Sequence, residues 1–280
     1  MENKSKLFEV NSMKSYFNLK KKNIIITGAA GFLGSQYVEA LIQFNANPIC
    51  LDINFAKLKI LKNNIQKKYN VNLEIYKTDI SSEKEVMKIK KKIYKKFNSV
   101  DVLINNAANN PTMKKIKKNV NFIENYQMDS WYKEIKIGLT GSFLMSKIFG
   151  SEMSKNKNGG NIINISSDLG IISPDQRLYV SKNGIDKKPI TYSIVKTGII
   201  GMTRYLATYW KNKIRCNALC IGGMENNHDK NFVKKLTKLI PMGRMAKKNE
   251  YNGAIVFLCS DASSYMNGSL LVLDGGRTII

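Results

Sequence analysis

Two residues four positions apart carry the clearest chemistry in this sequence, Tyr192 and Lys196. In a helix this spacing places both side chains on one face. A lysine ammonium beside a phenol favours the phenolate, so we expect Lys196 to lower the pKa of Tyr192 from about 10 toward the working range of an acid/base catalyst. A chain with 13 tyrosines and many lysines also produces this spacing by chance, so the pair needs support from the rest of the chain.

A glycine-rich turn provides that support. Gly28, Gly31 and Gly34 follow an apolar, β-branched segment at residues 23–27, which predicts a buried parallel strand. Residues 35–44 then show helical spacing. A dinucleotide site needs this order of strand, turn and helix, because glycines let backbone amides approach a pyrophosphate and the helix N-terminus adds partial positive charge. The alternative is an ordinary strand-to-helix turn.

An acidic residue, Asp52, ends a second predicted strand at residues 48–51 and stands 18 positions after Gly34. This offset is close to the roughly 20 residues expected of a ribose-binding acid. A carboxylate there accepts hydrogen bonds from ribose hydroxyls and repels a 2′-phosphate, so the sequence favours NAD over NADP. A turn residue at a strand end is the alternative interpretation of Asp52.

Further motifs make the chain resemble the short-chain dehydrogenase/reductase family from about Lys22 to Gly276. They are Asp79, the Asn-Asn-Ala-Ala turn at 105–108, the strand 162–167 ending in Ser167, and the segments 215–219, 241–244, 257–261 and 274–276. The alternation of apolar strands and helical stretches predicts an α/β fold with a doubly wound, Rossmann-like parallel sheet. We expect a polar N-terminal extension at residues 1–19 and a single NAD-binding oxidoreductase domain at residues 20–280.

The resemblance implies a hydride transfer between NAD and a hydroxyl or carbonyl substrate. Tyr192 would exchange a proton with the substrate oxygen, Ser167 would orient that oxygen, and Lys196 would bind the nicotinamide ribose. The implied cofactor-binding residues are Thr27, Gly28, Gly31, Phe32, Leu33, Gly34, Asp52, Asp79, Ile80, Asn105, Ala107, Tyr192, Lys196 and Gly222.

The substrate stays open at this point. A sugar or sugar nucleotide of surface-glycan modification is one candidate, and a 3-oxoacyl carrier protein is another. A cofactor-binding protein with weak or no turnover is a hypothesis of a different class. Family members usually form dimers or tetramers through the helices that here contain Gly138 and Tyr192, which implies a homodimer or homotetramer.

Three departures from the family pattern concern single positions. The glycines are spaced as in the longer, sugar-nucleotide branch, with Phe32 where the single-domain branch has glycine. Gly138 stands where the family has a catalytic asparagine that holds a relay water. Ile221-Gly222 replaces the usual Pro-Gly, and the threonine that often contacts the nicotinamide amide is absent from residues 223–228.

The fourth departure is an insertion. Tyr192 stands 25 positions after Ser167 (192 minus 167), about twice the family spacing, so residues 171–189 carry extra chain beside the substrate pocket. Tyr179 has the usual spacing, but no lysine stands four positions after it, and Pro189 opposes a helix there. We therefore expect Tyr192 to be catalytic and Tyr179 to line or close the pocket, with a surface loop as the alternative.

The composition raises a nucleic-acid hypothesis, since the formal net charge is +24. Lysine runs at residues 20–22, 88–96 and 114–118 lack interleaved aromatic residues, so we interpret them as solvated helix faces and expect no nucleic-acid partner. Attraction of anionic substrates stays open. The chain has no run of 18 apolar residues, and its first residues lack the apolar core of a signal peptide, so we expect a cytoplasmic protein without membrane association.

The remaining candidates for chemistry are cysteines and one histidine. The four cysteines, Cys50, Cys216, Cys220 and Cys259, lie in apolar patterns and predict buried, reduced thiols. With His228 as the only histidine, a Cys/His metal site is not expected. His228 is interpreted as a solvated loop residue.

Overall fold

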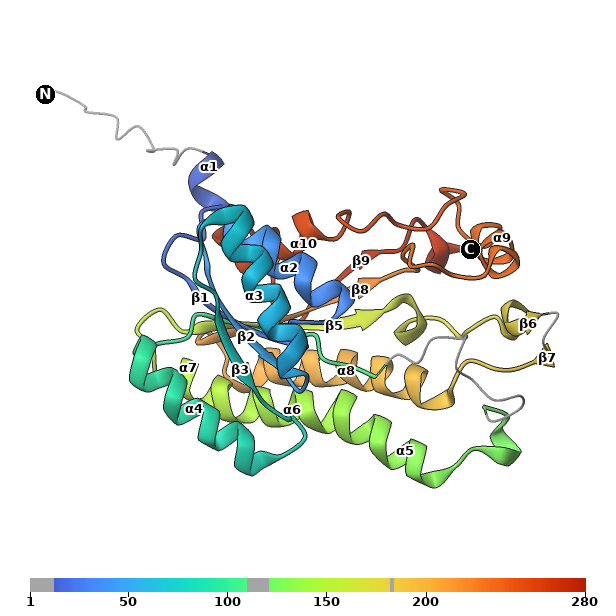
Figure 1. The fold of residues 1–280 in the computed structure, drawn as a ribbon, viewed down its shortest axis with the longest axis horizontal. Coiled ribbons are helices and arrows are strands. Elements are labelled where there is room, and N and C mark those ends of the chain that lie inside the picture. Colours follow the sequence, from blue (N-terminus) through green and yellow to red (C-terminus); the bar gives the residue numbers. More distant parts are fainter. Residues whose placement is uncertain (1–12, 110–120, 182–183) are drawn as a thin grey trace, which may run out of the picture.

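Short apolar strands form one parallel sheet at the centre of the molecule. The computed structural model describes residues 13–109, 121–181 and 184–280 (Figure 1). The strand order within these residues is β3-β2-β1-β4-β5-β8-β9. The strands are β1 (Asn23–Thr27), β2 (Asn47–Asp52), β3 (Glu74–Lys77), β4 (Val102–Asn105), β5 (Gly160–Ser167), β8 (Ile214–Ile221) and β9 (Leu270–Leu273). The predicted α/β class with a doubly wound sheet is confirmed.

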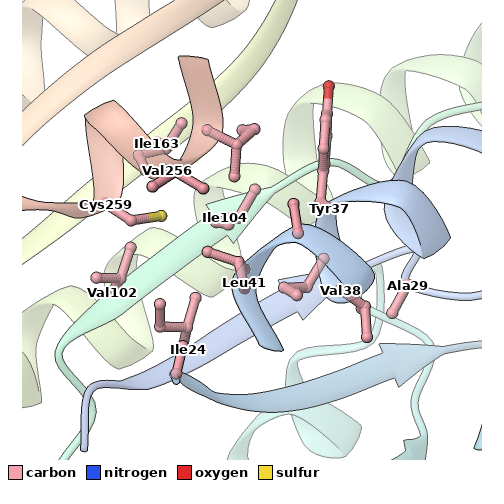
Figure 2. Packing of buried hydrophobic residues seen from close by; sticks show 14 of the residues in the cluster. Ile24, Ala29, Tyr37, Val38, Leu41, Val102, Ile104, Ile163, Val256 and Cys259 are labelled. Carbon is pink, nitrogen blue, oxygen red and sulfur yellow. The ribbon is translucent and has the colours of Figure 1, made fainter. Parts of the chain in front are cut away.

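Helices cover both faces of the sheet (Figure 1). One face carries α2 (Phe32–Gln43), α3 (Phe55–Tyr69) and α10 (Asn252–Cys259), and the other carries α4 (Glu83–Phe97), α8 (Ile190–Tyr209) and the helix that runs from α5 to α7. Side chains alternate between the two cores along β1: Ile24 and Ile26 pack into the first, and Ile25 into the second. Figure 2 shows the first core, where Tyr37, Val38 and Leu41 of α2 gather near Ile24 and Ile104.

Helix boundaries follow capping residues that the sequence supplies. At α4, the Ser82 side chain accepts a hydrogen bond from Glu85 N, and Asn98 ends the helix with φ 60°. Val86, Ile89 and Ile93 are the buried side chains of α4. Most lysines of the run 88–96 therefore lie on its solvent side, as predicted. The run 114–118 lies outside the described residues.

One long helical segment carries Gly138. It consists of α5 (Met128–Ile135), α6 (Gly141–Met145) and α7 (Ser151–Met153), joined by two wide π-turns at Lys136–Thr140 and Ser146–Gly150. Such turns insert an extra residue into a helix and are frequent at functional sites. Gly138 lies inside the first π-turn.

The chain packs onto the core before residue 20. After α1 (Met13–Tyr16), Leu19 is fully buried, and the Phe17 and Phe257 rings lie 6.5 Å apart. Leu19 and the half-buried Phe17 thus join the core that α2 and α10 share, and the domain boundary at residue 20 stays a prediction. Residues 1–12 lie outside the described range.

The insertion forms a small lobe at the carboxyl end of the sheet. It contains the 3-10 turn Gln176–Tyr179 and a two-stranded hairpin of β6 (Val180–Ser181) and β7 (Gly184–Ile185), and the 3-10 turn Asp168–Gly170 lies between β5 and the insertion. Helix α9 (Lys230–Thr237) packs beside it. The remaining 3-10 turns are Ile123–Asn125, Asp261–Ser263 and Arg277–Ile279.

Two simpler expectations concern thiols and membranes. All four cysteines are buried and free, as predicted. Across the three described ranges, we find no helix whose length and apolarity would let it cross a bilayer.

Candidate active site

The three predicted catalytic residues meet at the carboxyl end of β5. Ser167 is the last residue of that strand, and Tyr192 and Lys196 lie in the first turns of α8. Two bonds join helix to strand, since Ser166 Oγ donates to the Lys196 carbonyl and Lys196 Nζ donates to the Ile165 carbonyl, both at 2.8 Å. Ser167 lies close enough to the phenol of Tyr192 to influence its pKa. Ligands of open α/β sheets bind at this end of the strands.

The environment of Tyr192 differs from the sequence-based expectation. Burial raises the pKa of Tyr192 to about 12, the nearby Ser167 side chain opposes the rise, and the Asp168 carboxylate adds to it. Lys196 Nζ lies 5.8 Å from the ring centroid and is bonded to the Ile165 carbonyl. The expectation of a lowered pKa is therefore wrong for this structure, because desolvation of the phenolate outweighs the nearby charge.

A second lysine lies closer to the phenol. Lys188 Nζ is 3.8 Å from the centroid of the Tyr192 ring, above its face. The backbone N–H of Lys188 donates to Gln176 Oε1 at 3.1 Å, which ties the residue to the 3-10 turn of the insertion. Burial lowers the pKa of Lys188 to about 8 and that of Lys196 to about 8, and the charge of Lys188 contributes to the second shift.

A buried ion pair lies on the other side of Ser167. Ser167 Oγ donates to Asp168 Oδ1 at 2.6 Å, and Arg277 Nη1 donates to Asp168 Oδ2 at 2.6 Å. Asp168 and Arg277 are 3% and 6% exposed. Removing one partner would leave an uncompensated buried charge, so the pair fixes the carboxylate beside the serine. Sequence analysis missed both residues, which are 109 positions apart and follow no motif that pairs them.

The glycine turn has the shape that a pyrophosphate needs. Gly28 has φ +63°, and a Cβ there would lie 2.8 Å from Ala107 Cα. A Cβ on Gly34 would lie 2.2 Å from the Gly28 carbonyl oxygen, so α2 packs directly on the turn. Helix α2 begins at Phe32 after the extended Gly31. The first-turn amides of α2, at Phe32, Leu33 and Gly34, have no intrahelical acceptor and can bind an anion.

The two acidic candidates lie at the ends of neighbouring strand segments. Asp52 Oδ2 accepts from Ala30 N at 3.0 Å, and Asp52 Oδ1 accepts from Asn54 N at 2.8 Å. Asp52 therefore shapes the turn, as the alternative interpretation held, and each oxygen retains a lone pair for a ribose hydroxyl. Asp79 Oδ1 accepts from the amide and hydroxyl of Ser81 at 2.9 and 2.7 Å. Ile80 buries its side chain where it would meet a Cβ on Gly141 at 2.8 Å.

Thr27 connects the glycine turn to the end of β4. Its hydroxyl accepts from the amides of Asn106 and Ala107 at 3.0 and 3.1 Å. Asn106 Nδ2 donates in return to the carbonyls of Thr27 and Gly28 at 3.0 and 3.2 Å. Asn106 is thus a supporting residue that the sequence-based set omitted, although it stands in the recognised Asn-Asn turn.

The Asn105 side chain, by contrast, makes its hydrogen bonds inside the protein. It is 3% exposed, and its Nδ2 donates to Ser146 Oγ at 2.9 Å and Asn164 Oδ1 at 2.8 Å. Gly222 also has a packing role, because a Cβ there would lie 2.8 Å from Asp274 Cα. Contact of Asn105 or Gly222 with a cofactor stays a prediction.

Gly138 faces α8, the helix that bears the predicted catalytic residues Tyr192 and Lys196. A Cβ at Gly138 would lie 2.6 Å from Val195 Cγ1, a contact that requires something to shift. The Gly138 carbonyl accepts from Ser142 Oγ at 2.8 Å. Val195 therefore occupies the space that an asparagine side chain would need at this position.

Tyr179 lies in the interior of the insertion lobe. It is 6% exposed and packs with Leu178, Leu236, Ile240 and Met245, and its ring lies 5.9 Å from that of Phe232. No α-helix begins at Tyr179, which ends a 3-10 turn, whereas α8 begins at Ile190 directly after Pro189. The helix argument for Tyr192 is confirmed. The surface-loop alternative for Tyr179 is wrong, because α9 covers its ring.

Comparison with known proteins agrees with this geometry. Residues 28–278 match the family model described as "Enoyl-(Acyl carrier protein) reductase". The chain is 29% identical to NADP-dependent mannitol dehydrogenase of Alternaria alternata, over 97% of both chains. It is 29% identical to post-translational flagellin modification protein A of Campylobacter coli, over 92% of this chain and 98% of that one.

A solved structure of a similar protein has the same fold. The short chain dehydrogenase of Leptospira borgpetersenii serovar Hardjo-bovis with bound NAD+ superimposes with a TM-score of 0.82 at 27% identity. The match covers 99% of this chain and 100% of that one. Both NAD and NADP occur among the similar proteins, and nicotinamide cofactor use is common to them.

Proposed function

Because the chain belongs to the short-chain dehydrogenase/reductase family, we propose that it is an NAD-dependent oxidoreductase acting on a hydroxyl or carbonyl group of a sugar or sugar nucleotide. The observation that carries the proposal is that Ser167, Tyr192 and Lys196 meet at the carboxyl end of β5, where Ser166 Oγ and Lys196 Nζ join α8 to that strand. When bound, the nicotinamide supplies or accepts the hydride.

The residues of the chain then divide the work. The first-turn amides of α2 would hold the pyrophosphate, and Asp52 would bind the adenosine ribose. Tyr192 is protonated at neutral pH, since its pKa is raised to about 12, and this suits donation of a proton to a carbonyl oxygen during reduction. In the opposite direction its phenolate would accept the hydroxyl proton. Ser167, held by Asp168, would fix the position of the substrate oxygen.

The preference for NAD rests on Asp52. Its carboxylate lies at the end of β2 beside the glycine turn, hydrogen-bonded to Ala30 N. A 2′-phosphate placed against this carboxylate would meet like charge without an opposing cation in the contacts that Asp52 makes.

The sugar substrate rests on similarity and on the insertion. A relative named for flagellin modification covers 92% of this chain. The insertion adds a lobe at the end of the sheet where ligands bind, which suits a substrate larger than a simple alcohol. A 3-oxoacyl carrier protein, the substrate class nearer to the family model's description, fits less well because such reductases usually prefer NADP.

Cofactor binding with weak or no turnover is the second candidate function. Gly138 favours it, because Val195 fills the space in which the family's asparagine would hold a relay water. Binding of NAD fits both functions, so only turnover separates them.

We also propose a homo-oligomer formed through α5, α6 and α8. Four aromatic side chains on these helices are exposed at 49–65%, namely Tyr132, Phe143, Tyr205 and Tyr209. Burial of such aromatic surface is a common basis of subunit association. Light scattering at several protein concentrations tests this association.

A substrate screen tests the catalytic proposal. Purified protein would be mixed with NAD and sugar nucleotides, polyols or hydroxyacyl thioesters, and NADH formation followed at 340 nm. We expect sugars or sugar nucleotides to react, and Tyr192→Phe to abolish the signal. NAD binding without turnover across all classes would instead support the second candidate.

A further inference from the structure

Among the residues that the structure describes, the lysine nearest the ring of Tyr192 comes from the insertion and not from the Tyr-x-x-x-Lys motif. Lys188 Nζ lies 3.8 Å from the ring centroid, against 5.8 Å for Lys196 Nζ. We propose that Lys188 is a positioning residue that acts through Tyr192, holding the phenol toward Ser167 and stabilising its phenolate. The inference rests on the proposed role of Tyr192 as the proton donor and acceptor.

Lys196, the lysine of the Tyr-x-x-x-Lys motif, directs a hydrogen bond to the strand and not to the Tyr192 ring. Lys196 Nζ donates to the Ile165 carbonyl at 2.8 Å, so one of its three protons is directed at the strand and away from the ring. Its backbone carbonyl is held by Ser166 Oγ at 2.8 Å. This arrangement leaves Lys196 suited to binding a ribose hydroxyl, while the ring face of Tyr192 receives its closest cation from Lys188.

The insertion holds Lys188 in place from two sides. Gln176 Oε1 accepts from the Lys188 amide at 3.1 Å, and Pro189 follows with φ −52° as the residue before α8. The 3-10 turn that bears Gln176 is anchored by Leu178 and Tyr179, which pack against α9. The lobe therefore fixes where the backbone of Lys188 enters the site, and a proline prevents that backbone from joining the helix.

The position is compatible with an attractive cation–π contact and a charge effect. An ammonium within about 6 Å of a ring centroid is attracted to the ring face. An opposite charge within about 4–6 Å favours the charged form of a titrating group. Because Nζ lies over the ring, Lys188 acts on the phenolate by charge, and the proton itself passes between Tyr192 Oη and the substrate oxygen.

The surrounding charges set the state of Lys188. Asp168 and Glu134 favour its ammonium form, whereas burial and Arg277 oppose it. Lys196, on the same helix as Tyr192, is a further cation and feels the charge of Lys188. When Tyr192 gives its proton to a carbonyl oxygen, the new phenolate strengthens the hold of Lys188 on its own proton, so the two residues titrate as a pair.

Three variants test the inference by activity. Lys188→Met keeps the length and removes the charge, and Lys188→Arg keeps the charge. Lys187→Met is the matched control, since Lys187 Nζ lies 5.5 Å from the Phe122 ring centroid instead. We expect Lys188→Met to lower kcat about tenfold at pH 7 with KM little changed, Lys188→Arg to restore most of the loss, and Lys187→Met to resemble the unmutated protein.

A spectroscopic titration tests it without turnover. A tyrosine at position 192, fluorinated heavily enough that its phenol titrates below the pKa of Lys188 (about 8), would be titrated by ¹⁹F NMR in the cofactor-free protein, so that Lys188 carries its charge throughout the titration. Lys188→Met should raise the apparent pKa of this residue by about 1, and Lys187→Met should not. An unchanged titration in Lys188→Met overturns the inference, even if activity falls.

The outcomes separate this inference from the proposed function. If Tyr192→Phe retains turnover, the proposed function fails. If Tyr192→Phe is inactive while Lys188→Met is as active as Lys187→Met, only the role of Lys188 fails. A higher KM restricted to anionic substrates, with an unchanged titration, would overturn the positioning role and assign Lys188 to substrate binding.

Discussion

The effect on stability of a substitution at Gly138 depends on one neighbouring side chain, that of Val195. A methyl group added by Gly138→Ala would lie 2.6 Å from Val195 Cγ1 and 3.6 Å from Val195 Cβ. The first distance is a clash, and the second is ordinary van der Waals contact. The variant should therefore be destabilising beside valine and tolerated beside alanine.

The magnitude follows from two opposing terms. Overpacking of a buried site costs about 1–3 kcal/mol. Alanine recovers up to about 1 kcal/mol relative to glycine in a helix. The net loss is about 0–2 kcal/mol, which corresponds to a fall in Tm of up to about 8 °C for a chain of this size.

Thermal unfolding of four proteins checks the reasoning. They are the unmutated chain, Gly138→Ala, Val195→Ala and the double variant. In the Val195→Ala background the clash is removed, so Gly138→Ala should be neutral or stabilising, and the two changes should couple by about 1–2 kcal/mol. Gly201→Ala is the control, since Gly201 lies in α8 with nothing within 4 Å of a new Cβ, and it should raise Tm.

An equal cost of Gly138→Ala in both backgrounds would refute the argument, because the clash with Val195 would then not be its cause. The same contact bears on catalysis. Gly138→Asn beside Val195 should lower Tm without raising turnover, because a larger side chain meets the same methyl group. A variant unchanged in both Tm and rate would mean that position 138 does not correspond to the family asparagine.

Three further predictions concern the cofactor and the catalytic tyrosine. NADH should bind at least tenfold more tightly than NADPH, about 1.4 kcal/mol, and Asp52→Ala should narrow the gap; equal affinities in a fluorescence titration would contradict the role of Asp52. Tyr192→Phe should lower turnover by several orders of magnitude with NAD affinity nearly unchanged, whereas Tyr179→Phe should do much less in the same steady-state assay. With the pKa of Tyr192 raised to about 12, its phenolate fraction grows about tenfold per pH unit below that value, so alcohol oxidation should accelerate from pH 6 to 9 while carbonyl reduction, which uses the protonated phenol, stays nearly flat. An oxidation rate that levels off below pH 8 would indicate a lowered pKa instead.

Local patterns were sufficient for the fold and for much of the site. The β-branched run at residues 23–27 became β1, and the glycines after it became a turn that α2 packs upon. The choice between Tyr179 and Tyr192 was also local, because Pro189 and the residue four positions on decide which tyrosine can begin a helix with its lysine. In each case the residues that determine the local structure lie close together in the sequence.

Other features of the site depend on contacts between residues that are far apart in the sequence. The buried carboxylate of Asp168 is paired with Arg277, which lies 109 positions away. The sequence around either residue does not predict its partner. The hydrogen bonds of the Asn105 amide to Ser146 and Asn164 likewise do not follow from its motif, and its contact with a cofactor stays a prediction. Hydrogen bonds and ion pairs of this kind form where distant parts of the chain meet in the fold. The spacing of residues along the sequence does not predict them.

Lys188 shows most clearly why spacing alone misassigned the electrostatics of the site. It precedes Tyr192 by the same four positions by which Lys196 follows it, but Pro189 removes it from the helix, so the pattern offered no reason to place it on the ring. A motif specifies which residues share a helix face. The pKa of Tyr192 depends also on its burial, which raises it, and on the charges around the ring, where the Lys188 ammonium lies 3.8 Å from the centroid. Burial thus opposes formation of the phenolate and the Lys188 ammonium assists it, so Lys188→Met removes the assisting charge.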